Sequence, residues 1–413
     1  MYQIVSGLES HPQIRLNKKL FVLDPLHICD RTILRRLLQI RARFSIVSLQ
    51  TRDRMHSPLK APDRCPYCNS SRISVKGTRQ KKLERVRIYR CSSCGRRFTP
   101  GPTALRNKTY PVREILEAMT LYDQGYSLAE TGKRISSQYG HSVNPSTISR
   151  WLNEHERLTS YRRLRERGVR LFTPSQTTRS IKLYHRQVYE FAYHRPKLEF
   201  VRKGMLDDKR TGDTRFAPLA DFLESVPTKC PHDLFRNEDG LRGSQLSDAF
   251  VDQKRLLVNE KQNIATETAA LVLPTVGTNY ERHSKLQRFM LGNDSCTLAV
   301  EIPIWLGESD IAALEKQYGV ELAANGGTPR SITGHIDFIQ VRNGAVHILD
   351  YKPDARTNKP IAQLVIYALA LTRLVPGLKL FDIKCAWFNE EQYCEFFPRT
   401  ALAVYRDEPR RSR

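Results

Sequence analysis

The 413-residue sequence lacks any apolar run that approaches the ~18 residues needed by a membrane-spanning helix. Its opening stretch, MYQIVSGLESHPQIRLNKKL, lacks the continuous apolar core of a secretory signal. A GxxxxGK[ST] segment, the phosphate loop of helicase motors, is also missing. These absences predict a cytoplasmic protein without a membrane anchor, for which any unwinding motor would be a separate partner.

Acidic residues are scarce relative to basic ones, 43 against 67, and the formal net charge is +24. The imbalance is uneven, because residues 276–400 carry thirteen Lys and Arg against fourteen Asp and Glu, whereas residues 1–275 carry a net +23. A basic front half predicts binding to DNA and association with the nucleoid, and a neutral back half predicts a different task. A soluble protein with a merely basic pI is the alternative.

Nine cysteines, an odd number, in a chain without an export signal favour metal binding and reduced thiols over disulfides. Two CxxC pairs, Cys65/Cys68 and Cys91/Cys94, supply four thiolates for a tetrahedral zinc ion. The segments RISV and RVRIYR between them alternate like a β-hairpin, and Gly95 suits a tight turn. We expect a zinc ribbon over residues 61–101. The ten Lys and Arg of residues 72–97 suit phosphate contact, although a purely structural zinc clamp is compatible with them.

Residues 108–157 predict three helices. Pro111 and Gly125 bound the first, Ser127 and Glu130 form a capping-box pattern at the second, and Asn144 precedes the third. Two short helices joined by a glycine-bearing turn indicate a helix-turn-helix. Its third helix would turn three residues inward and present three to the DNA major groove. The inward set is Ile148, Trp151 and Leu152; the outward set is Ser146, Thr147 and Arg150. A small helical bundle without a DNA role is the alternative.

The order of ribbon and helices resembles the N-terminal DNA-binding region of many prokaryotic insertion-sequence transposases. The resemblance covers residues 62–155 and depends on the paired cysteines, YRCSSCGRRF and STISRWL. It implies a mobile-element ancestry but does not imply that the chain transposes.

Three flanking segments carry weaker signals. Residues 1–60 are a basic extension in which RTILRRLLQIRARF predicts a short helix; Met55 resembles a natural start, so the preceding residues read as an appendage or an over-extended reading frame. Residues 158–275 predict a connecting α/β domain without recognisable chemistry. Residues 401–413 form a basic tail.

The stretch GHIDFIQVRNGAVHILDYK, residues 334–352, predicts a hairpin with a two-residue Asn343-Gly344 loop. In that register Asp337 lies directly opposite Asp350, and Lys352 shares their face. Both faces are mostly apolar, so the hairpin should be buried. Opposed carboxylates repel and need a proton, a base or a cation, and Mg²⁺ or Mn²⁺ would serve. Lys352 would orient or deprotonate a water, or neutralise charge in a phosphoryl transition state. A buried Asp–Lys ion pair with a spare Asp is the alternative.

These residues resemble the core of the PD-(D/E)XK nucleases, most closely the RecB-like branch that includes CRISPR-adaptation nucleases. The resemblance covers residues 277–398. It implies a restriction-endonuclease-like core in which Glu301 of AVEIPIW and His283 of NYERHSKLQRFML support the metal, with Glu281 as a competing ligand. It also implies a place near DNA or the catalytic face for Gln363 and Tyr367 of KPIAQLVIYALAL, and closing strands in KLFDIKCAWFNEEQYCEFFP.

Two features depart from that pattern. Thirty-two residues, including SDIAALEKQYG, separate Glu301 from Gly334, and this insertion would shape access of the substrate. Relatives often hold an iron–sulfur cluster through four cysteines. The cysteines available here are Cys230, Cys296, Cys385 and Cys394. No three of them are closely spaced in the sequence, so we expect no such cluster.

The sequence therefore predicts a multidomain α+β protein with a nuclease core at residues 276–400. We expect a metal-dependent DNA nuclease of a mobile-element, defence or repair system, in which Asp337 and Asp350 bind Mg²⁺ or Mn²⁺ and Lys352 activates water. Two alternatives stay open: a DNA-binding regulator with an idle nuclease-like domain, and the nuclease subunit of a transposition machine. A transposase, helicase or defence protein is the expected partner.

Overall fold

The computed structural model describes most of the chain in two units, Met1–Pro58 and Leu59–Arg413. In the first unit, β1 (Gln13–Leu16) pairs antiparallel with β2 (Lys19–Val22). The expected basic helix at residues 31–44 and residues 403–413 of the tail lie outside the described residues. In the second unit the described ranges are 62–100, 109–206, 211–236, 240–252, 256–276, 279–322 and 329–402.

Residues 62–100 form a small three-stranded antiparallel sheet of β3 (Ile73–Gln80), β4 (Arg85–Cys91) and β5 (Arg97–Phe98). The hairpin expected between the two cysteine pairs is confirmed. Only four side chains form its apolar core, namely Cys65, Tyr89, Cys91 and Phe98. A fold with so small a core needs a further source of stability.

The three helices expected after the ribbon are α2 (Val112–Asp123), α3 (Leu128–Tyr139) and α4 (Pro145–Glu154). The capping box is confirmed, because the Ser127 hydroxyl accepts from the Glu130 backbone and the Glu130 carboxylate accepts from the Ser127 backbone. Asn144 is the N-cap residue of α4, as expected. A fourth helix, α5 (Arg162–Leu171), follows.

A nine-stranded mixed sheet organises the rest of this unit. Its order is β6-β7-β10-β11-β12-β13-β14-β9, with the short β8 beside β11. β12 runs parallel to β13 and β8 parallel to β11, whereas the other pairs are antiparallel. Residues 158–275 contribute four of the strands: β6 (Thr178–Tyr184), β7 (Val188–His194), β8 (Leu241–Arg242) and β9 (Asn259–Glu260). The others are β10 (Thr297–Gly307), β11 (Ser331–Arg342), β12 (Ala345–Tyr351), β13 (Ile383–Phe388) and β14 (Tyr393–Phe396).

The hairpin of β11 and β12 has the predicted register. Phe338 pairs with Leu349, and the ladder continues to the turn. Asn343 and Gly344 have φ values of 53° and 69°, the left-handed conformations that a type I′ turn requires.

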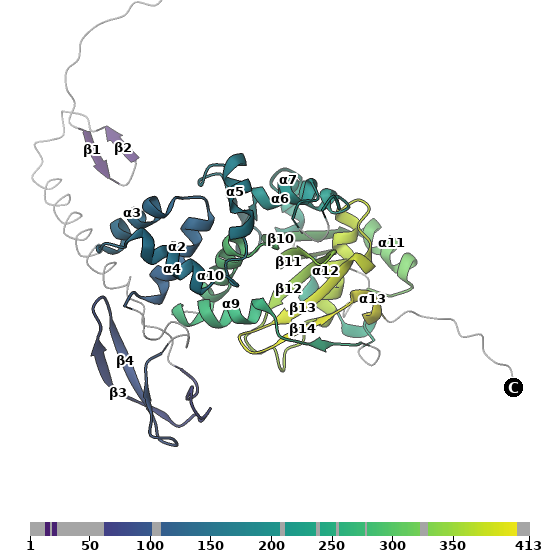
Figure 1. The fold of residues 1–413 in the computed structure, drawn as a ribbon. Helices are drawn as coiled ribbons and strands as arrows, with labels where there is room; N and C mark the ends of the chain where they lie inside the picture. The colour runs from purple at the N-terminus through teal and green to yellow at the C-terminus, as the bar shows by residue number, and fades with distance from the viewer. Residues whose placement is uncertain are drawn as a thin grey trace, which may run out of the picture. The chain divides into compact units, whose positions relative to one another are not determined.

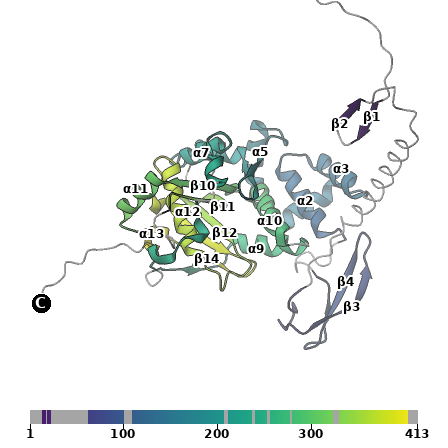
Figure 2. The ribbon, with the colours of Figure 1, turned by 180° about the vertical axis from the view of Figure 1, so that it is seen from behind.

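Helices cover both faces of the sheet and create two cores. One face packs against α6 (Arg195–Arg202), α7 (Ala217–Lys229) and α12 (Ile361–Leu374), the helix that connects the parallel strands β12 and β13. Figure 1 shows α12 lying across strands β10–β13. The other face packs against α9 (Ile264–Val272) and α10 (Asn279–Asn293), and α10 also contacts α2; Figure 2 gives the view from behind. The remaining helices are short or peripheral: α8 (His232–Arg236), α11 (Glu308–Tyr318) and α13 (Pro398–Ala401).

The burial of both faces confirms the expectation that the β11–β12 hairpin is interior. None of the helices within the described ranges is long and apolar enough to cross a membrane.

Candidate active site

Three acidic residues stand at one level across three neighbouring strands. The register of β10 against β11 is regular on both sides of Glu301 and places it opposite Asp337. The hairpin register, extended by one residue, places Asp337 opposite Asp350. Glu301, Asp337 and Asp350 therefore form a row that crosses β10, β11 and β12.

This row borders a pocket of about 300 Å³, here called the carboxylate pocket. It collects residues from five strands, β7, β8, β10, β11 and β12, and from the two helices α10 and α12. All the residues expected at the nuclease core line it: His283, Glu301, Asp337, Asp350, Lys352, Gln363 and Tyr367. The structure thus brings together every side chain that the sequence singled out in this region, except Glu281, which does not line the pocket.

Hydrogen bonds and ion pairs engage the two aspartates differently. One Asp337 oxygen accepts from the Tyr351 backbone N–H at 3.0 Å and lies 3.6 Å from His283 Nδ1. Asp350 Oδ2 lies 2.8 Å from Lys352 Nζ. Burial lowers the pKa of the Lys352 amine, but the Asp350 carboxylate outweighs burial and the net pKa is raised. Lys352 is therefore a cation at neutral pH.

The carboxylates are electrostatically crowded. Burial and then the Asp337 charge raise the pKa of Glu301 to about 7, and the same two causes raise the pKa of Asp350 to about 7. Three crowded acids, of which Asp350 is buried and Glu301 and Asp337 are half-buried, are a donor set that suits a hard divalent cation. In the structure no three of His283, Glu301, Asp337 and Asp350 bring one ligand atom each within 4.8 Å of one another. A bound cation would have to draw these side chains together.

Glu301 has a strained backbone. Its φ of 51° lies in the left-handed region, which a non-glycine residue inside a strand rarely adopts and which costs about 1–3 kcal/mol. The Gln287 amide donates to Glu301 Oε1 at 2.8 Å and holds the carboxylate. Neither the strain nor the Gln287 contact was expected from the sequence, although Gln287 lies one helical turn after His283. Strain of this kind clusters at functional sites.

The glycine of the GHID stretch makes room for an aromatic ring. A Cβ on Gly334 would lie 2.6 Å from the Tyr367 hydroxyl, and a Cβ on Gly243 would lie 2.6 Å from the Tyr367 ring. Tyr367 thus lies between two glycines, and the Gln363 amide donates to its hydroxyl at 3.2 Å. The Tyr367 ring is buried and forms part of the lining of the carboxylate pocket.

Replacing Gly334 with Ala should destabilise the fold by about 1–3 kcal/mol, because the added Cβ would lie 2.4–2.7 Å from three atoms of the Tyr367 ring and hydroxyl and would force that side chain to shift. Thermal melting should show this loss, and the added change Tyr367→Leu should restore much of it. If Gly334→Ala alone melts like the wild type, the close approach does not constrain this residue.

A second wall of the pocket comes from residues that sequence reasoning missed. It contains Tyr189 of β7, Arg242 of β8, Ser244 and His335. Arg242 donates to the Tyr189 hydroxyl and places a positive charge beside the acidic row. No motif announces these residues, because the pairing of β7 with β10 and of β8 with β11 brings them to the site.

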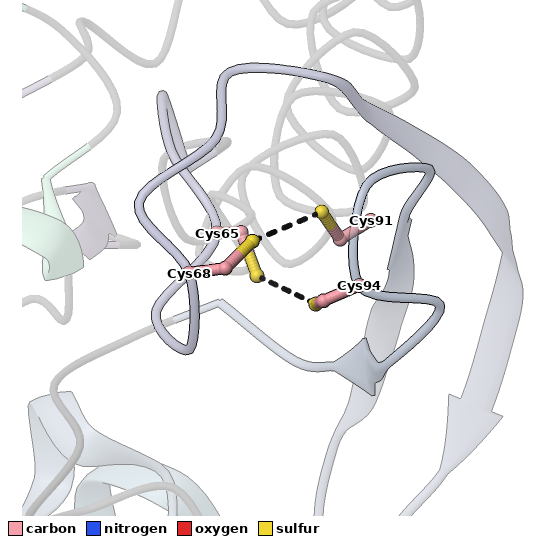
Figure 3. Close-up of side chains that lie close together, drawn as sticks. All are labelled: Cys65, Cys68, Cys91 and Cys94. Atoms are coloured by element: carbon pink, nitrogen blue, oxygen red, sulfur yellow. Dashed lines mark hydrogen bonds between the residues drawn. The ribbon is translucent and has the colours of Figure 1, made fainter.

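The four ribbon cysteines converge, as Figure 3 shows. The sulfur–sulfur distances are 3.6 Å for Cys65–Cys94 and 3.5 Å for Cys68–Cys91. Sulfurs that bind one tetrahedral zinc at ~2.3 Å lie ~3.7 Å apart, so a zinc ion fits. The Cys94 backbone N–H lowers the pKa of Cys91 to about 6, which favours the thiolate.

Both cysteine turns use a left-handed residue directly after the second cysteine. Gly95 has φ of 71°, as its place in the sequence led us to expect, and Asn69 has φ of 58°. Asn69 was not singled out from the sequence, although Asn is the residue that most readily replaces Gly in this conformation.

Replacing Cys65 and Cys68 with Ser should remove the ribbon's zinc and unfold residues 62–100, because the metal supplies much of the folding free energy of so small a unit. DNA binding should weaken, while the nine-stranded sheet keeps its thermal transition. Zinc content, DNA affinity and melting of the same preparation check this. A double variant that keeps all the metal of the wild type would contradict it.

On α4 the inward residues expected from the sequence are buried, namely Ile148, Trp151 and Leu152. Ser146 and Arg150 are exposed and Thr147 is half-buried. The helices are tied to α10, which carries His283 and Gln287 of the pocket, because the Asn293 amide donates to Thr120 of α2 at 2.9 Å. Helix α10 therefore connects the helices α2–α4 to the carboxylate pocket.

Comparison with known proteins gives one match. Residues 253–397 match the family model of the PD-(D/E)XK nuclease superfamily, whose members generally hydrolyse phosphodiester bonds with Mg²⁺ or Mn²⁺. The matched range contains the acidic row and Lys352. A search of curated proteins and a search of solved structures found no match.

Proposed function

We propose that the protein is a metal-dependent DNA nuclease that hydrolyses phosphodiester bonds and is directed to duplex DNA by its N-terminal half. The observation that carries the proposal is the convergence of Glu301, Asp337, Asp350 and Lys352 on one pocket inside the stretch that matches the nuclease superfamily. An idle fold has no use for three crowded carboxylates, because their mutual repulsion destabilises it.

The residues present fit a divalent cation. Asp337 and Asp350 would hold it, with Glu301 and His283 in support. When bound, Mg²⁺ or Mn²⁺ lowers the pKa of a coordinated water and polarises the scissile phosphate. Hydrolysis bonds the water oxygen to phosphorus and releases the leaving oxygen with a proton.

Lys352 is suited to stabilise the charge that develops on the phosphate. Its ammonium group is held 2.8 Å from Asp350 and is charged, so it acts as a fixed cation in a buried site. Arg242 on the opposite wall offers a second cation, and Gln363 offers an amide donor, for the phosphates that flank the scissile bond. The binding of water and phosphate between these groups would exclude bulk solvent from the reacting atoms.

Targeting is the task we propose for the front half. The helices α2–α4 are read as a helix-turn-helix, because α4 presents Arg150 and Ser146 to solvent while its other face is buried. The basic ribbon would contact phosphates. Together they support the likeness to transposase N-termini, and the Gln363–Tyr367 pair supports the RecB-like branch. We infer a setting in a mobile element, defence or repair system of a prokaryote, on nucleoid DNA.

Removing one charge from the acidic row should stabilise the metal-free protein at high pH. The pKa of Glu301 is raised in the folded state, so its contribution to stability is complete below the unfolded pKa and is lost as the pH rises through about 7. The Glu301→Gln side chain can still accept the hydrogen bond from Gln287. At pH 8 the free energy of unfolding of this variant should exceed that of the wild type by about 2 kcal/mol. That gain corresponds to roughly 4–8 °C in melting temperature and should vanish near pH 4.

The control is Glu321→Gln, at an exposed glutamate. It should change the melting temperature equally at both pH values. With added Mn²⁺ the wild type should melt at a higher temperature than Glu301→Gln, since the cation stabilises the charged row. If the difference in melting temperature between Glu301→Gln and the wild type is the same at pH 4 and pH 8, the carboxylates of the row do not repel one another.

The function is tested by incubating the full chain with linear, circular and single-stranded DNA in Mn²⁺, Mg²⁺ or EDTA. We expect cleavage with either metal and none with EDTA. Cleavage of circular DNA identifies an endonuclease, and cleavage confined to linear DNA identifies an exonuclease. Tight DNA binding without cleavage of any substrate would overturn the proposal in favour of a DNA-binding regulator.

A further inference from the structure

A second group of metal-ligand side chains lies apart from the ribbon and the acidic row. It comprises His185, Cys230 and His232, whose ligand atoms all lie within 4.8 Å of one another. His185 occupies the turn between β6 and β7, Cys230 caps the C-terminus of α7, and His232 begins α8. His185 and Cys230 are buried and His232 is half-buried.

The distances suit one tetrahedral ion. His185 Nε2 lies 3.0 Å from His232 Nδ1 and 3.9 Å from Cys230 Sγ. Two nitrogens that bind zinc at ~2.0–2.1 Å lie ~3.3 Å apart, and a sulfur at ~2.3 Å lies ~3.6 Å from such a nitrogen. Small shifts of the side chains therefore bring the three atoms to the corners of one coordination sphere.

The other nitrogen of His185 has the partner that a metal-binding histidine needs. His185 Nδ1 lies 2.9 Å from His335 Nε2, so its N–H can donate to His335 while Nε2 faces the cluster. The Phe235 ring stacks on His185 at 4.0 Å and the Tyr189 ring stacks on His335 at 3.6 Å. The imidazoles are thus held in orientation from several sides.

We propose that His185, Cys230 and His232 bind a second zinc ion, with His335 orienting His185. Zinc is bound by cysteine and histidine together, and three protein ligands leave a fourth position for water. The inference depends on ligand geometry and not on the proposed nuclease activity.

The site would stabilise one wall of the carboxylate pocket. Its ligands come from two segments about 45 residues apart in sequence, the β6–β7 turn and the α7–α8 junction, which one ion would join. His335 and Tyr189 line that pocket, and the His335 backbone N–H donates to the Tyr367 hydroxyl. The zinc would therefore stabilise the wall that contains Tyr189 and His335, and it would not take part in hydrolysis.

Zinc content of the full chain, purified from zinc-supplemented cells and freed of loosely bound metal, tests the proposal. We expect about two zinc ions per chain in the wild type and about one in Cys65→Ser/Cys68→Ser. Adding Cys230→Ser to that double variant should remove the remaining ion. Cys394→Ser is the matched control, because Cys394 is 8% and Cys230 7% exposed, and it should retain the wild-type content.

Cobalt replacement in the Cys65→Ser/Cys68→Ser chain gives a second readout. A thiolate-to-cobalt charge-transfer band should appear and should be lost with Cys230→Ser. His232→Asn, at a half-buried position, replaces that variant if Cys230→Ser fails to fold. About one zinc in the wild type, all of it lost with Cys65 and Cys68, would overturn the proposal and leave a hydrogen-bonded histidine chain. A second ion other than zinc would overturn the choice of metal.

Discussion

Replacing Asp350 with Asn or Lys352 with Met is expected to lower the rate of DNA cleavage by roughly 10²–10³-fold or more, with duplex binding nearly unchanged. Asp350 supplies one of the two aspartate ligands expected for the cation. Lys352 supplies the ammonium group 2.8 Å from it, which acts mainly in the transition state. The two variants should differ in metal affinity: Asp350→Asn weakens Mn²⁺ binding and Lys352→Met does not.

The controls lie close by. Asp354→Asn and Lys359→Met change exposed residues of the same segment that do not line the carboxylate pocket. Cleavage rates, Mn²⁺ titrations and thermal melts of the four variants should separate chemistry from folding. Wild-type cleavage by Asp350→Asn and Lys352→Met would leave this pocket without a catalytic role.

Duplex affinity is expected to fall by roughly 10³-fold between 50 and 200 mM salt, because the +23 charge of residues 1–275 would release counterions from several phosphates. Arg167 and Arg170 of α5 are exposed, whereas Arg165 donates to the carbonyls of Tyr122 and Tyr126 and holds α5 to α2. Arg167→Ala/Arg170→Ala should therefore lower the log–log salt slope by about 2 on any sequence.

Arg150→Ala on α4 should instead weaken binding to the preferred sequence by about 1–3 kcal/mol more than binding to others. Arg356→Ala, on the neutral back half of the chain and paired with Glu391, is the control and should leave both the slope and the preference unchanged. Salt-dependent binding curves on preferred and scrambled duplexes measure all three variants. Equal slopes for Arg167→Ala/Arg170→Ala and wild type would place the phosphate contacts elsewhere.

The features that the sequence predicted are those encoded by neighbouring residues. The Asn343-Gly344 turn determines the hairpin register, and the register determines which side chains oppose. The Ser127–Glu130 capping box determines where α3 begins. Two pairs of cysteines, each pair separated by two residues, predict that the four thiols meet at one metal site.

The features that were missed depend on contacts between distant segments. Arg242 reaches the pocket only because β8 pairs with β11, about ninety residues on, and a two-residue strand has no readable periodicity. His185, Cys230 and His232 have no metal-motif spacing, and the fold alone gathers them. The left-handed backbone of Glu301 is a local strain that surrounding structure imposes, so its residue type could not announce it.

The most direct test of the acidic row is Mn²⁺-dependent cleavage of one plasmid by wild type and by Asp337→Asn, purified in parallel. Asp337 is the central residue of the row, and an Asn oxygen can still accept from the Tyr351 N–H, so the variant should fold. We predict that the wild type cuts the plasmid in Mn²⁺ and that folded Asp337→Asn cuts it at least ~10²-fold more slowly. Equal cutting by the two proteins, or cutting by the wild type that persists in EDTA, would contradict a cation held by these carboxylates.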